Sequence, residues 1–376
     1  MKWRRLWSAV LAGALMAGLC ACGGQNHAEK NLPDAVLKPE DYQVETVEAA
    51  WDTGFLWFFC ADQRFFYTAG VQELMDDASR EVPLYAFDPE NKETEEITLP
   101  LGAGWHLYTM TPAPDGGYWM AFTPLTVGST TTNYTPNPCW LVKTDGSFQE
   151  QFRIDLSQYS QEQVRVANVI CPKTSQYARD SEESLGWTPA EKMEFFKPEL
   201  ICDDQGRVYV AAANENLLVF DQDGTLLTKL DVFDVAYSQG VCLAKTYDGT
   251  VAIGLTGGGD YQIRTVDKDT LALSEPVERK NEDGKLDRLT PAPSLLPDYD
   301  LFGYGYYGLY GVKFGEDGST YSSEPLLYYG TDNDLPLDGN GTLRDTALGR
   351  QLAYMKLGEL QEDGSKNVYY SMLTMK

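Results

Sequence analysis

The sequence predicts an all-β protein, a β-propeller of about seven four-stranded blades, and three observations support this prediction. Long stretches with helical periodicity are hard to find. Short alternating strands are separated by Asp-Gly and Asn-Gly turns, which are typical of β-hairpins. The chain has 23 Tyr, 34 Gly and 19 Pro residues, and this mixture of aromatic residues and turn formers suits an all-β chain.

A turn followed by an aromatic or β-branched strand recurs along the chain. It occurs at residues 115–119, 204–210 and 248–252. The step from Asp204 to Asp248 is 44 residues, and the step from Asp115 to Asp204 is 89, close to twice that. The spacing indicates a repeated structural unit.

A second unit is a strand that ends in an acidic turn and reverses into another strand. It occurs at residues 84–99, 141–148, 217–227, 263–273 and 310–321. A period of about 45 residues with four short strands is typical of a β-propeller, whose sheets bury their apolar faces by packing around an axis. About 330 residues therefore correspond to roughly seven blades, within a range of six to eight. The alternative is an irregular multi-sheet β-sandwich.

Two polar stretches interrupt this rhythm. Residues 155–195 are rich in Gln, Ser, Glu and Lys, and Thr188-Pro189 predicts the start of a short helix, with threonine as the N-cap and proline at the first helical position. We interpret this stretch as an insertion between blades or a long loop over one face. Residues 278–297 form a second polar loop.

The amino-terminal segment looks like the signal peptide of a bacterial lipoprotein. Basic residues precede an apolar run over residues 6–19, which is too short to span a bilayer. The run ends in Leu19-Cys20-Ala21-Cys22, which looks like a lipobox. We therefore expect residues 1–21 to be removed, with acyl chains on Cys22 as a stable membrane anchor and residues 22–40 as a flexible tether before one propeller-like domain at 41–376. The alternative is a soluble secreted protein with an ordinary cleavage site.

Charge and cysteine content exclude several classes of protein. The net charge of −26 repels phosphate backbones, so nucleic-acid binding is not expected. No zinc-ligand spacing occurs, and neither a metal nor a cofactor is expected. The remaining cysteines are expected to be mostly buried thiols, with at most one or two disulfides; they are Cys60, Cys139, Cys171, Cys202 and Cys242.

Recognised enzyme motifs are missing from the sequence. His106 lies beside Trp105 in a predicted strand and is interpreted as structural rather than as a general base. The segment 221–224 resembles half of a calcium loop, but its glycine comes too early, so an acidic hairpin turn explains it better.

Aromatic residues are the candidate ligand-binding groups. They could stack on sugar rings or on a peptide, and the alternative is that they fill space between blades. The candidates are Trp105, Tyr108, Tyr118, Trp119, Tyr304, Tyr306 and Tyr307.

Four short segments carry a resemblance to a known group of proteins. The stretch 47–54, followed by Cys60-Ala61-Asp62 and Phe65-Phe66-Tyr67-Thr68, and the later stretch 301–312, resemble a propeller-like region of surface lipoproteins from Clostridia and their relatives. In that group the region often precedes a solute-binding domain of an ABC importer. The resemblance implies a propeller on the outer face of the cell membrane. The sequence ends at Lys376, where the solute-binding domain would otherwise follow, so importer function is not carried over.

These observations predict a non-enzymatic binding or scaffolding module, held to the membrane through the lipid on Cys22. Its expected partners are a glycan, a peptide or another surface protein. One alternative is an accessory component of solute capture for an ABC importer. Another is a propeller-type hydrolase or lyase, which a cluster of two or three carboxylates at the axial mouth would favour.

Overall fold

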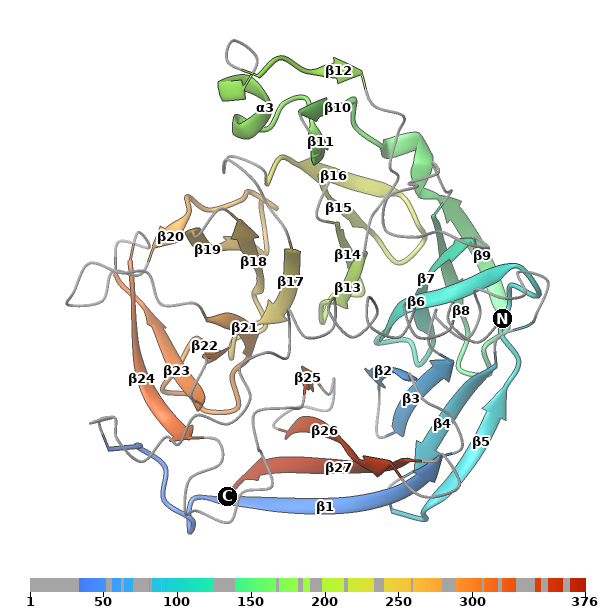
Figure 1. Cartoon of the computed structure of the whole chain (residues 1–376), viewed down its shortest axis with the longest axis vertical. Coiled ribbons are helices and arrows are strands. Elements are labelled where there is room, and N and C mark those ends of the chain that lie inside the picture. The colour runs from blue at the N-terminus through green and yellow to red at the C-terminus, as the bar shows by residue number, and fades with distance from the viewer. Residues whose placement is uncertain are drawn as a thin grey trace, which may run out of the picture.

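Six four-stranded antiparallel sheets are arranged in a ring in the computed structural model of the chain (Figure 1). Each sheet is one blade of a β-propeller, so the predicted fold class is confirmed. The structure describes residues 34–51, 56–61, 64–69, 81, 83–88, 90–124, 139–166, 169–181, 185–189, 198–212, 216–232, 240–257, 260–278, 289–305, 308–316, 320–328, 342–345, 351–360 and 366–376.

The blades follow one another along the chain and are numbered here in that order. Blade 1 contains β2 (Leu56–Ala61), β3 (Arg64–Ala69), β4 (Leu84–Asp88) and β5 (Glu93–Ile97). Blade 2 contains β6 (Trp105–Pro112), β7 (Tyr118–Pro124), β8 (Trp140–Thr144) and β9 (Glu150–Asp155). Blade 3 contains β13 (Glu199–Cys202), β14 (Val208–Ala211), β15 (Leu217–Phe220) and β16 (Leu226–Leu230).

The second half of the ring continues in the same way. Blade 4 contains β17 (Gly240–Lys245), β18 (Val251–Gly257), β19 (Asp260–Val266) and β20 (Val277–Glu278). Blade 5 contains β21 (Thr290–Pro293), β22 (Leu301–Tyr304), β23 (Gly308–Phe314) and β24 (Tyr321–Tyr328). Blade 6 contains β25 (Thr342–Asp345), β26 (Gln351–Leu360), β27 (Lys366–Met375) and β1 (Tyr42–Trp51).

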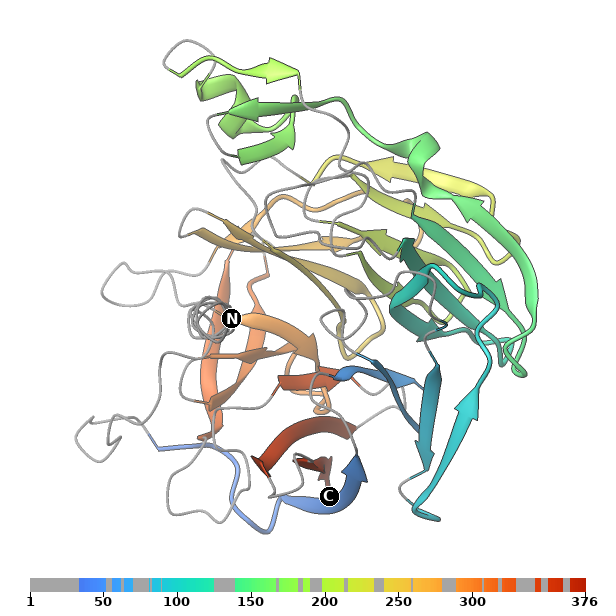
Figure 2. The same ribbon diagram turned by 45° about the vertical axis from the view of Figure 1, so that its right-hand side comes forward.

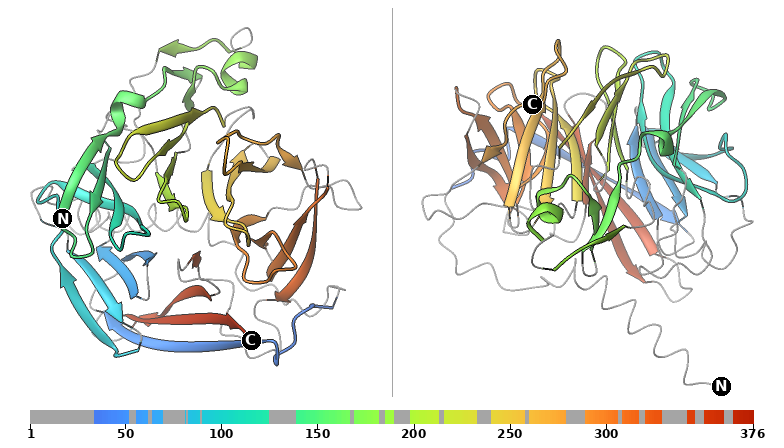
Figure 3. Two further views of the ribbon diagram at one scale, coloured as in Figure 1. Left: turned by 180° about the vertical axis from the view of Figure 1, so that it is seen from behind. Right: turned by 90° about the horizontal axis from the view of Figure 1, so that it is seen from above.

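The ring is closed by the two ends of the domain. β1 completes blade 6 by pairing antiparallel with β27, in a register that runs from Tyr42↔Met375 to Trp51↔Lys366. The first strands of neighbouring blades contact one another all the way around, including β21 with β25 and β25 with β2. Figure 3 shows this ring from behind and from its side. Pairing the first strand with the last joins the two ends of the domain in one sheet.

The described residues form six blades, which is the lower end of the predicted range of six to eight, because one segment of the chain is inserted between blades 2 and 3. It contains the 3₁₀-helix η2 (Leu156–Tyr159), a three-stranded sheet and α3 (Gln176–Ser181), and the sheet consists of β10 (Gln163–Val166), β11 (Val169–Pro172) and β12 (Thr188–Pro189). Figure 2 shows this segment projecting beyond the ring. The interpretation of the polar stretch as an insertion is confirmed.

The predicted helix start at Thr188 is wrong. Thr188 and Pro189 form β12, which pairs with β10, and an edge strand tolerates a proline that lacks an N–H donor. The helix begins earlier, after Ser175, whose Oγ accepts a hydrogen bond from the N–H of Ala178 at 3.2 Å. Serine is a preferred N-cap because its side-chain oxygen pairs with a free N–H of the first turn.

Four hairpin turns share one five-residue design, with glycine at the fourth position. In each, the first residue's N–H bonds to the carbonyl of the fifth residue, and the glycine N–H bonds to the carbonyl of the first. The glycines have φ angles between 80° and 84°, a region that residues with a Cβ rarely adopt. A type I turn followed by a left-handed residue is a common hairpin geometry. The turns are 113–117, 203–207, 221–225 and 246–250.

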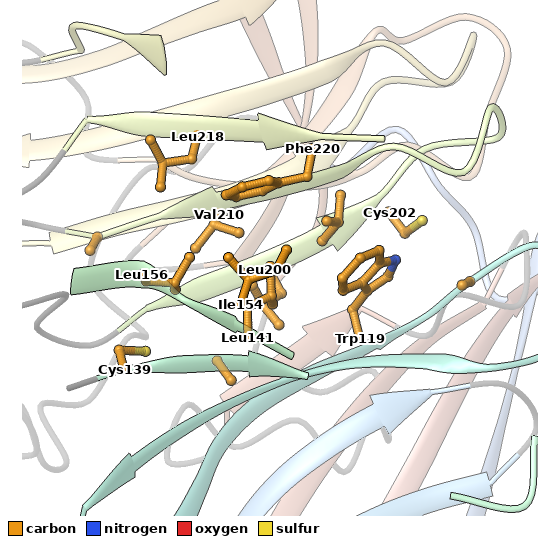
Figure 4. Packing of buried hydrophobic residues seen from close by; sticks show 14 residues of the cluster. Trp119, Cys139, Leu141, Ile154, Leu156, Leu200, Cys202, Val210, Leu218 and Phe220 are labelled. Carbon is orange, nitrogen blue, oxygen red and sulfur yellow. The ribbon is translucent and has the colours of Figure 1, made fainter. Parts of the chain in front are cut away.

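The hydrophobic core consists of separate clusters between neighbouring blades. Trp119, Leu141, Val210 and Phe220 belong to the cluster between blades 2 and 3, where side chains from both sheets interdigitate (Figure 4). Similar clusters join blades 1 and 2, blades 3 and 4, blades 4 and 5, and blades 5 and 6. This arrangement follows from the physics of the repeat, because a single blade leaves both apolar faces exposed.

In an antiparallel blade, the turn between strands one and two and the turn between strands three and four lie at the same end of the sheet. We call this end of the ring the hairpin end. The acidic turns identified in the sequence, including those at Asp115, Asp221 and Asp248, therefore gather at one axial end. Among the described residues, no helix is long and apolar enough to cross a membrane.

Candidate functional site

A pocket of about 490 Å³ opens at the hairpin end of blade 4. It lies between the turn that joins β17 to β18 and the turn that follows β19. Pockets of roughly 300–1,000 Å³ are typical of small-molecule sites. The lining residues are Asp248, Thr250, Thr265, Asp267, Lys268, Asp269, Thr270, Ala272, Leu273 and Ser274.

Local hydrogen bonds shape the second of these turns. Oδ1 of Asp267 accepts hydrogen bonds from the N–H of Asp269 at 3.1 Å and from the N–H of Thr270 at 2.7 Å. Leu271 follows with a positive φ of 56°. The side chain of Asp267 thus replaces backbone partners within the turn, which is the usual role of aspartate at such positions. Lys268 and Asp269 lie at the tip of this turn.

An ammonium group and a carboxylate from the two turns meet in the pocket. Nζ of Lys268 lies 3.3 Å from Oδ2 of Asp248 and also donates to the backbone carbonyl of Asp248. The side chain of Lys268 remains 37% exposed, so the ammonium can still reach a ligand. The pocket therefore contains a positive group held at a defined place.

Hydrogen bonds lower the pKa values of two carboxylates in the pocket, Asp248 and Asp267. Partial burial by itself raises the pKa of Asp248, but hydrogen bonds from Thr246, Thr250 and Lys268 outweigh it and lower the pKa to about 2. The pKa of Asp267 is also lowered, chiefly by the hydrogen bonds from Thr270. Asp248 is thus a permanent anion at ordinary pH, and it cannot act as a proton donor there.

Asp269 differs from the other two carboxylates. Its side chain is exposed, and within the part of the chain that the structure describes it makes no hydrogen bond or ion pair. A carboxylate without a partner can accept a proton from a bound water or orient a substrate hydroxyl. Together the pocket holds three carboxylates and one ammonium, so its charge disfavours anionic ligands.

The predicted aromatic platform is not assembled. Tyr118 is 3% exposed and Trp119 is fully buried, so neither can stack on a ligand. The ring of Tyr118 stacks on Phe148 with centroids 4.6 Å apart, and Trp119 belongs to the cluster between blades 2 and 3. The prediction that these two bind a ligand is wrong, because β7 is covered by neighbouring blades on both faces.

Trp105 and Tyr108 are not among the residues that line the pocket. Trp105 and Tyr108 are half-buried on β6 in blade 2, where Trp105 packs edge-on against Trp140. Tyr304 ends β22 in blade 5. Tyr306, Tyr307 and the predicted lipidation site Cys22 lie outside the described residues.

Several other predicted roles can be compared with the structure. His106 is buried within β6, as expected for a structural histidine. Oδ1 of Asp221 accepts hydrogen bonds from the N–H groups of Asp223 and Thr225, which confirms the acidic hairpin turn. Among the described residues, no group of three or more His, Cys, Asp or Glu side chains could hold a metal ion. Cys139 and Cys202 are buried in the cluster between blades 2 and 3.

Sequence reasoning identified both turns of the pocket but did not bring them together. Asp248 and Asp269 appeared as separate acidic turns in two different repeat units. The available signal was topological, because the first and last turns of one blade must share an end. That signal places the two turns at one end but does not reveal that a pocket lies between them.

A scan against protein-family models finds no match, and a search of curated proteins finds no relative. Solved structures do show similarity. A protein assigned as a gluconolactonase has a TM-score of 0.43 and 10% identity, over 89% of this chain and 92% of that one. Puromycin hydrolase has a TM-score of 0.34 and 11% identity, over 82% of this chain and 51% of that one. NirN, a dihydro-heme d1 dehydrogenase, has a TM-score of 0.34 and 11% identity, over 68% of this chain and 43% of that one.

The names of these neighbours differ from the function predicted from the sequence. Their names describe enzymes, whereas the sequence led us to expect a non-enzymatic binding or scaffolding module. We correct that prediction on this finding and retain its alternative, the propeller-type hydrolase or lyase. What each neighbour acts on is a property of that protein.

Proposed function

We propose that the chain is a propeller-type hydrolase whose active site is the pocket at the hairpin end of blade 4. The observation that carries this proposal is the ammonium of Lys268, held 3.3 Å from Oδ2 of Asp248 in a pocket that also contains the unpaired carboxylate of Asp269. A fixed positive group and a free base in one pocket can serve acyl transfer to water, as an oxyanion stabiliser and a general base.

The chemistry assigns one role to each group. Asp269 takes a proton from a bound water, whose oxygen attacks the carbonyl carbon of an ester. Lys268 stabilises the negative charge that develops on the carbonyl oxygen. When the tetrahedral intermediate collapses, the bond from carbon to the alkoxide breaks, and the protonated Asp269 returns its proton to the leaving oxygen.

Asp248 acts by holding Lys268 rather than by transferring a proton. Because its pKa is about 2, it remains negative throughout the working pH range. It therefore keeps the ammonium in place and balances its charge. Thr250, Thr265 and Ser274 line the same pocket. The hydroxyl of Thr250 donates to Asp248 and that of Ser274 donates to the carbonyl of Glu275, so towards a polar substrate these two hydroxyls act as hydrogen-bond acceptors.

The charge of the pocket supports neutral or cationic substrates. The pocket is lined by three aspartates and one lysine, and the whole chain carries a net charge of −26. An anionic ester would have to approach against this potential, which slows association and weakens binding. Substrates with hydroxyl or amino groups match the hydrogen-bonding groups of the lining.

A panel of chromogenic esters with neutral, cationic and anionic acyl groups tests the proposal on the purified mature domain. We expect turnover of neutral or cationic esters, lost in Asp269→Asn and retained in Asp223→Asn, a variant of an exposed turn in blade 3. No turnover of any ester, faster turnover of anionic esters, or full activity of Asp269→Asn would contradict it.

We further propose that the enzyme works outside the cell membrane, tethered through Cys22. The N–H groups of Val36 and Leu37 bond to the carbonyls of Pro325 and Leu326 at 2.9 and 3.1 Å, so the tether would leave from the outer strand of blade 5. Cys22→Ser should abolish incorporation of radiolabelled fatty acid. Unchanged labelling of this variant would contradict the anchor.

A further inference from the structure

An arginine from the neighbouring blade holds the turn that carries Lys268. Nη1 of Arg207, in the first turn of blade 3, donates a hydrogen bond to the backbone carbonyl oxygen of Lys268 in blade 4 at 2.7 Å. The side chain of Arg207 is only 10% exposed. Water therefore competes little for this bond between blades.

The guanidinium of Arg207 is itself fixed by a buried carboxylate. Oδ2 of Asp203 accepts hydrogen bonds from Nε of Arg207 at 2.6 Å and from the hydroxyl of Tyr209 at 3.1 Å. Oδ1 of Asp203 accepts two backbone N–H groups of the same turn. With both oxygens engaged and 5% of the side chain exposed, Asp203 leaves Arg207 one orientation.

The corresponding position differs in the related turns. Arg207 is the fifth residue of its turn, and the equivalent residues are Gly117 in blade 2 and Thr250 in blade 4. At Gly117, a Cβ would lie 2.0 Å from the carbonyl oxygen of Thr144 and 2.8 Å from Nζ of Lys143, so the third strand of blade 2 leaves no room for a side chain. Thr250 bonds within its own turn, to Asp248. Of these three turns, the one in blade 3 carries a cation that reaches another blade.

An ion pair also joins blades 3 and 4 beside this hydrogen bond, with its cation on blade 4. Nζ of Lys245, at the end of β17 in blade 4, lies 3.7 Å from Oδ1 of Asp204 in the first turn of blade 3. Asp204 is exposed, so this contact is weak compared with the bond from Arg207. Of these two polar contacts between blades 3 and 4, the bond from Arg207 is therefore the stronger.

We propose that Arg207 is a positioning residue for the pocket of blade 4. By fixing the carbonyl of Lys268, it sets where the ammonium of Lys268 lies relative to Asp248 and Asp269. Blade 3 therefore takes part in a site whose lining comes entirely from blade 4. This inference deepens the proposed function, because it concerns the same pocket.

Chemical labelling of Lys268 tests the proposal without a substrate. Brief acetylation with acetic anhydride, read by peptide mass spectrometry, measures how accessible each lysine amine is. The informative variant is Arg207→Lys, which keeps a charge beside Asp203 but cannot bond to both Asp203 and the carbonyl of Lys268. Arg153→Met is the matched control, since Arg153 pairs with Glu150 in the outer strand of blade 2.

We expect Arg207→Lys to raise the labelling rate of Lys268 by roughly tenfold, the change in equilibrium constant that loss of one hydrogen bond to a charged donor represents. Lys173, on the insertion, should label at its original rate, and Arg153→Met should change neither. Labelling of Lys268 that stays the same in Arg207→Lys and in Arg207→Met would overturn the proposal. If Arg207→Met does not fold, Arg207→Lys alone decides.

Kinetics separate this inference from the proposed hydrolase activity. In an active enzyme, Arg207→Lys should lower kcat more than it changes KM, because it displaces a group that acts on the transition state. If the wild-type protein hydrolyses no ester but the variant still exposes Lys268, the hydrolase proposal fails and the positioning role stands. If turnover is present but kcat is unaltered in Arg207→Lys, the positioning role fails.

Discussion

The ammonium of Lys143 lies 2.8 Å from Oδ1 and 2.7 Å from Oδ2 of Asp115. This ion pair joins the third strand of blade 2 to the first turn of the same blade. The side chain of Lys143 is 1% exposed, whereas that of Asp115 is 48% exposed. A buried cation thus depends on a partner that is half in water. Removing the charge of Asp115 should therefore change the stability of the protein by a different amount from removing the charge of Lys143.

We expect Asp115→Asn to destabilise the protein by about 1–2 kcal/mol, because it leaves the buried ammonium without a counter-charge. The value is below the 3–5 kcal/mol typical of fully buried pairs since water reaches Asp115. Lys143→Met should change stability by less than about 1 kcal/mol, because an apolar side chain fits the buried site. Urea unfolding of both variants measures the difference, and a larger loss for Lys143→Met would contradict this account.

The low pKa of Asp248 predicts a stability that depends on pH. A carboxyl group whose pKa is about 2 in the folded state and about 3.9 in the unfolded state stabilises the fold above pH 4. This contribution is lost as the pH falls from about 4 to about 2. The difference in Tm between the wild-type protein and Asp248→Asn should therefore shrink over that range. A difference that stays constant down to pH 2 would be inconsistent with the lowered pKa.

Two glycines of the hairpin turns separate backbone strain from steric overlap. Gly116 and Gly224 have φ angles of 84° and 80°, but only at Gly224 would a Cβ meet a neighbour, 2.6 Å from Phe152. Gly116→Ala should cost about 1–2 kcal/mol, the usual penalty for a residue with a Cβ in this region. Gly224→Ala should cost more, because Phe152 must also move. If chemical denaturation gives the same loss of unfolding free energy for both variants, the overlap between the new Cβ and Phe152 is relieved without a cost in stability.

The thiol of Cys202 should be unreactive in the folded protein. Burial raises its pKa to about 12, and the nearby carboxylate of Asp203 adds to the effect. Since only the thiolate reacts, iodoacetamide at pH 8 should leave Cys202 unmodified in the native protein. After unfolding in guanidinium chloride, the same reagent should modify Cys202. Peptide mass spectrometry identifies the site. Rapid modification of the native protein would contradict the buried position between blades 2 and 3.

Much of the fold could be predicted from the sequence because its local signals are strong. Asp-Gly turns such as Asp248-Gly249 require a positive φ, and they recur at the spacing of a blade. The blade count was harder, since length alone does not distinguish a blade from an insertion. The inserted segment of η2, α3 and β10–β12 contributes residues to the total but not a four-stranded sheet to the ring.

The site was less predictable because it depends on packing between blades. Trp119 and Tyr118 alternate along β7, yet both are buried, because each face of a blade meets another blade. A strand with one solvent face would have exposed one of them. The bond from Arg207 to Lys268 joins residues 61 apart in the chain, and no local pattern connects them.

The rate of ester hydrolysis in Lys268→Met tests the central claim most directly, with Lys173→Met as the control for loss of a lysine outside the pocket. The account predicts that kcat falls roughly 10²–10³-fold in Lys268→Met, the typical effect of removing one group that stabilises an oxyanion. Lys173→Met should retain the wild-type rate. Equal kcat values for Lys268→Met and the wild-type protein, with both folded, would contradict a hydrolase site in blade 4.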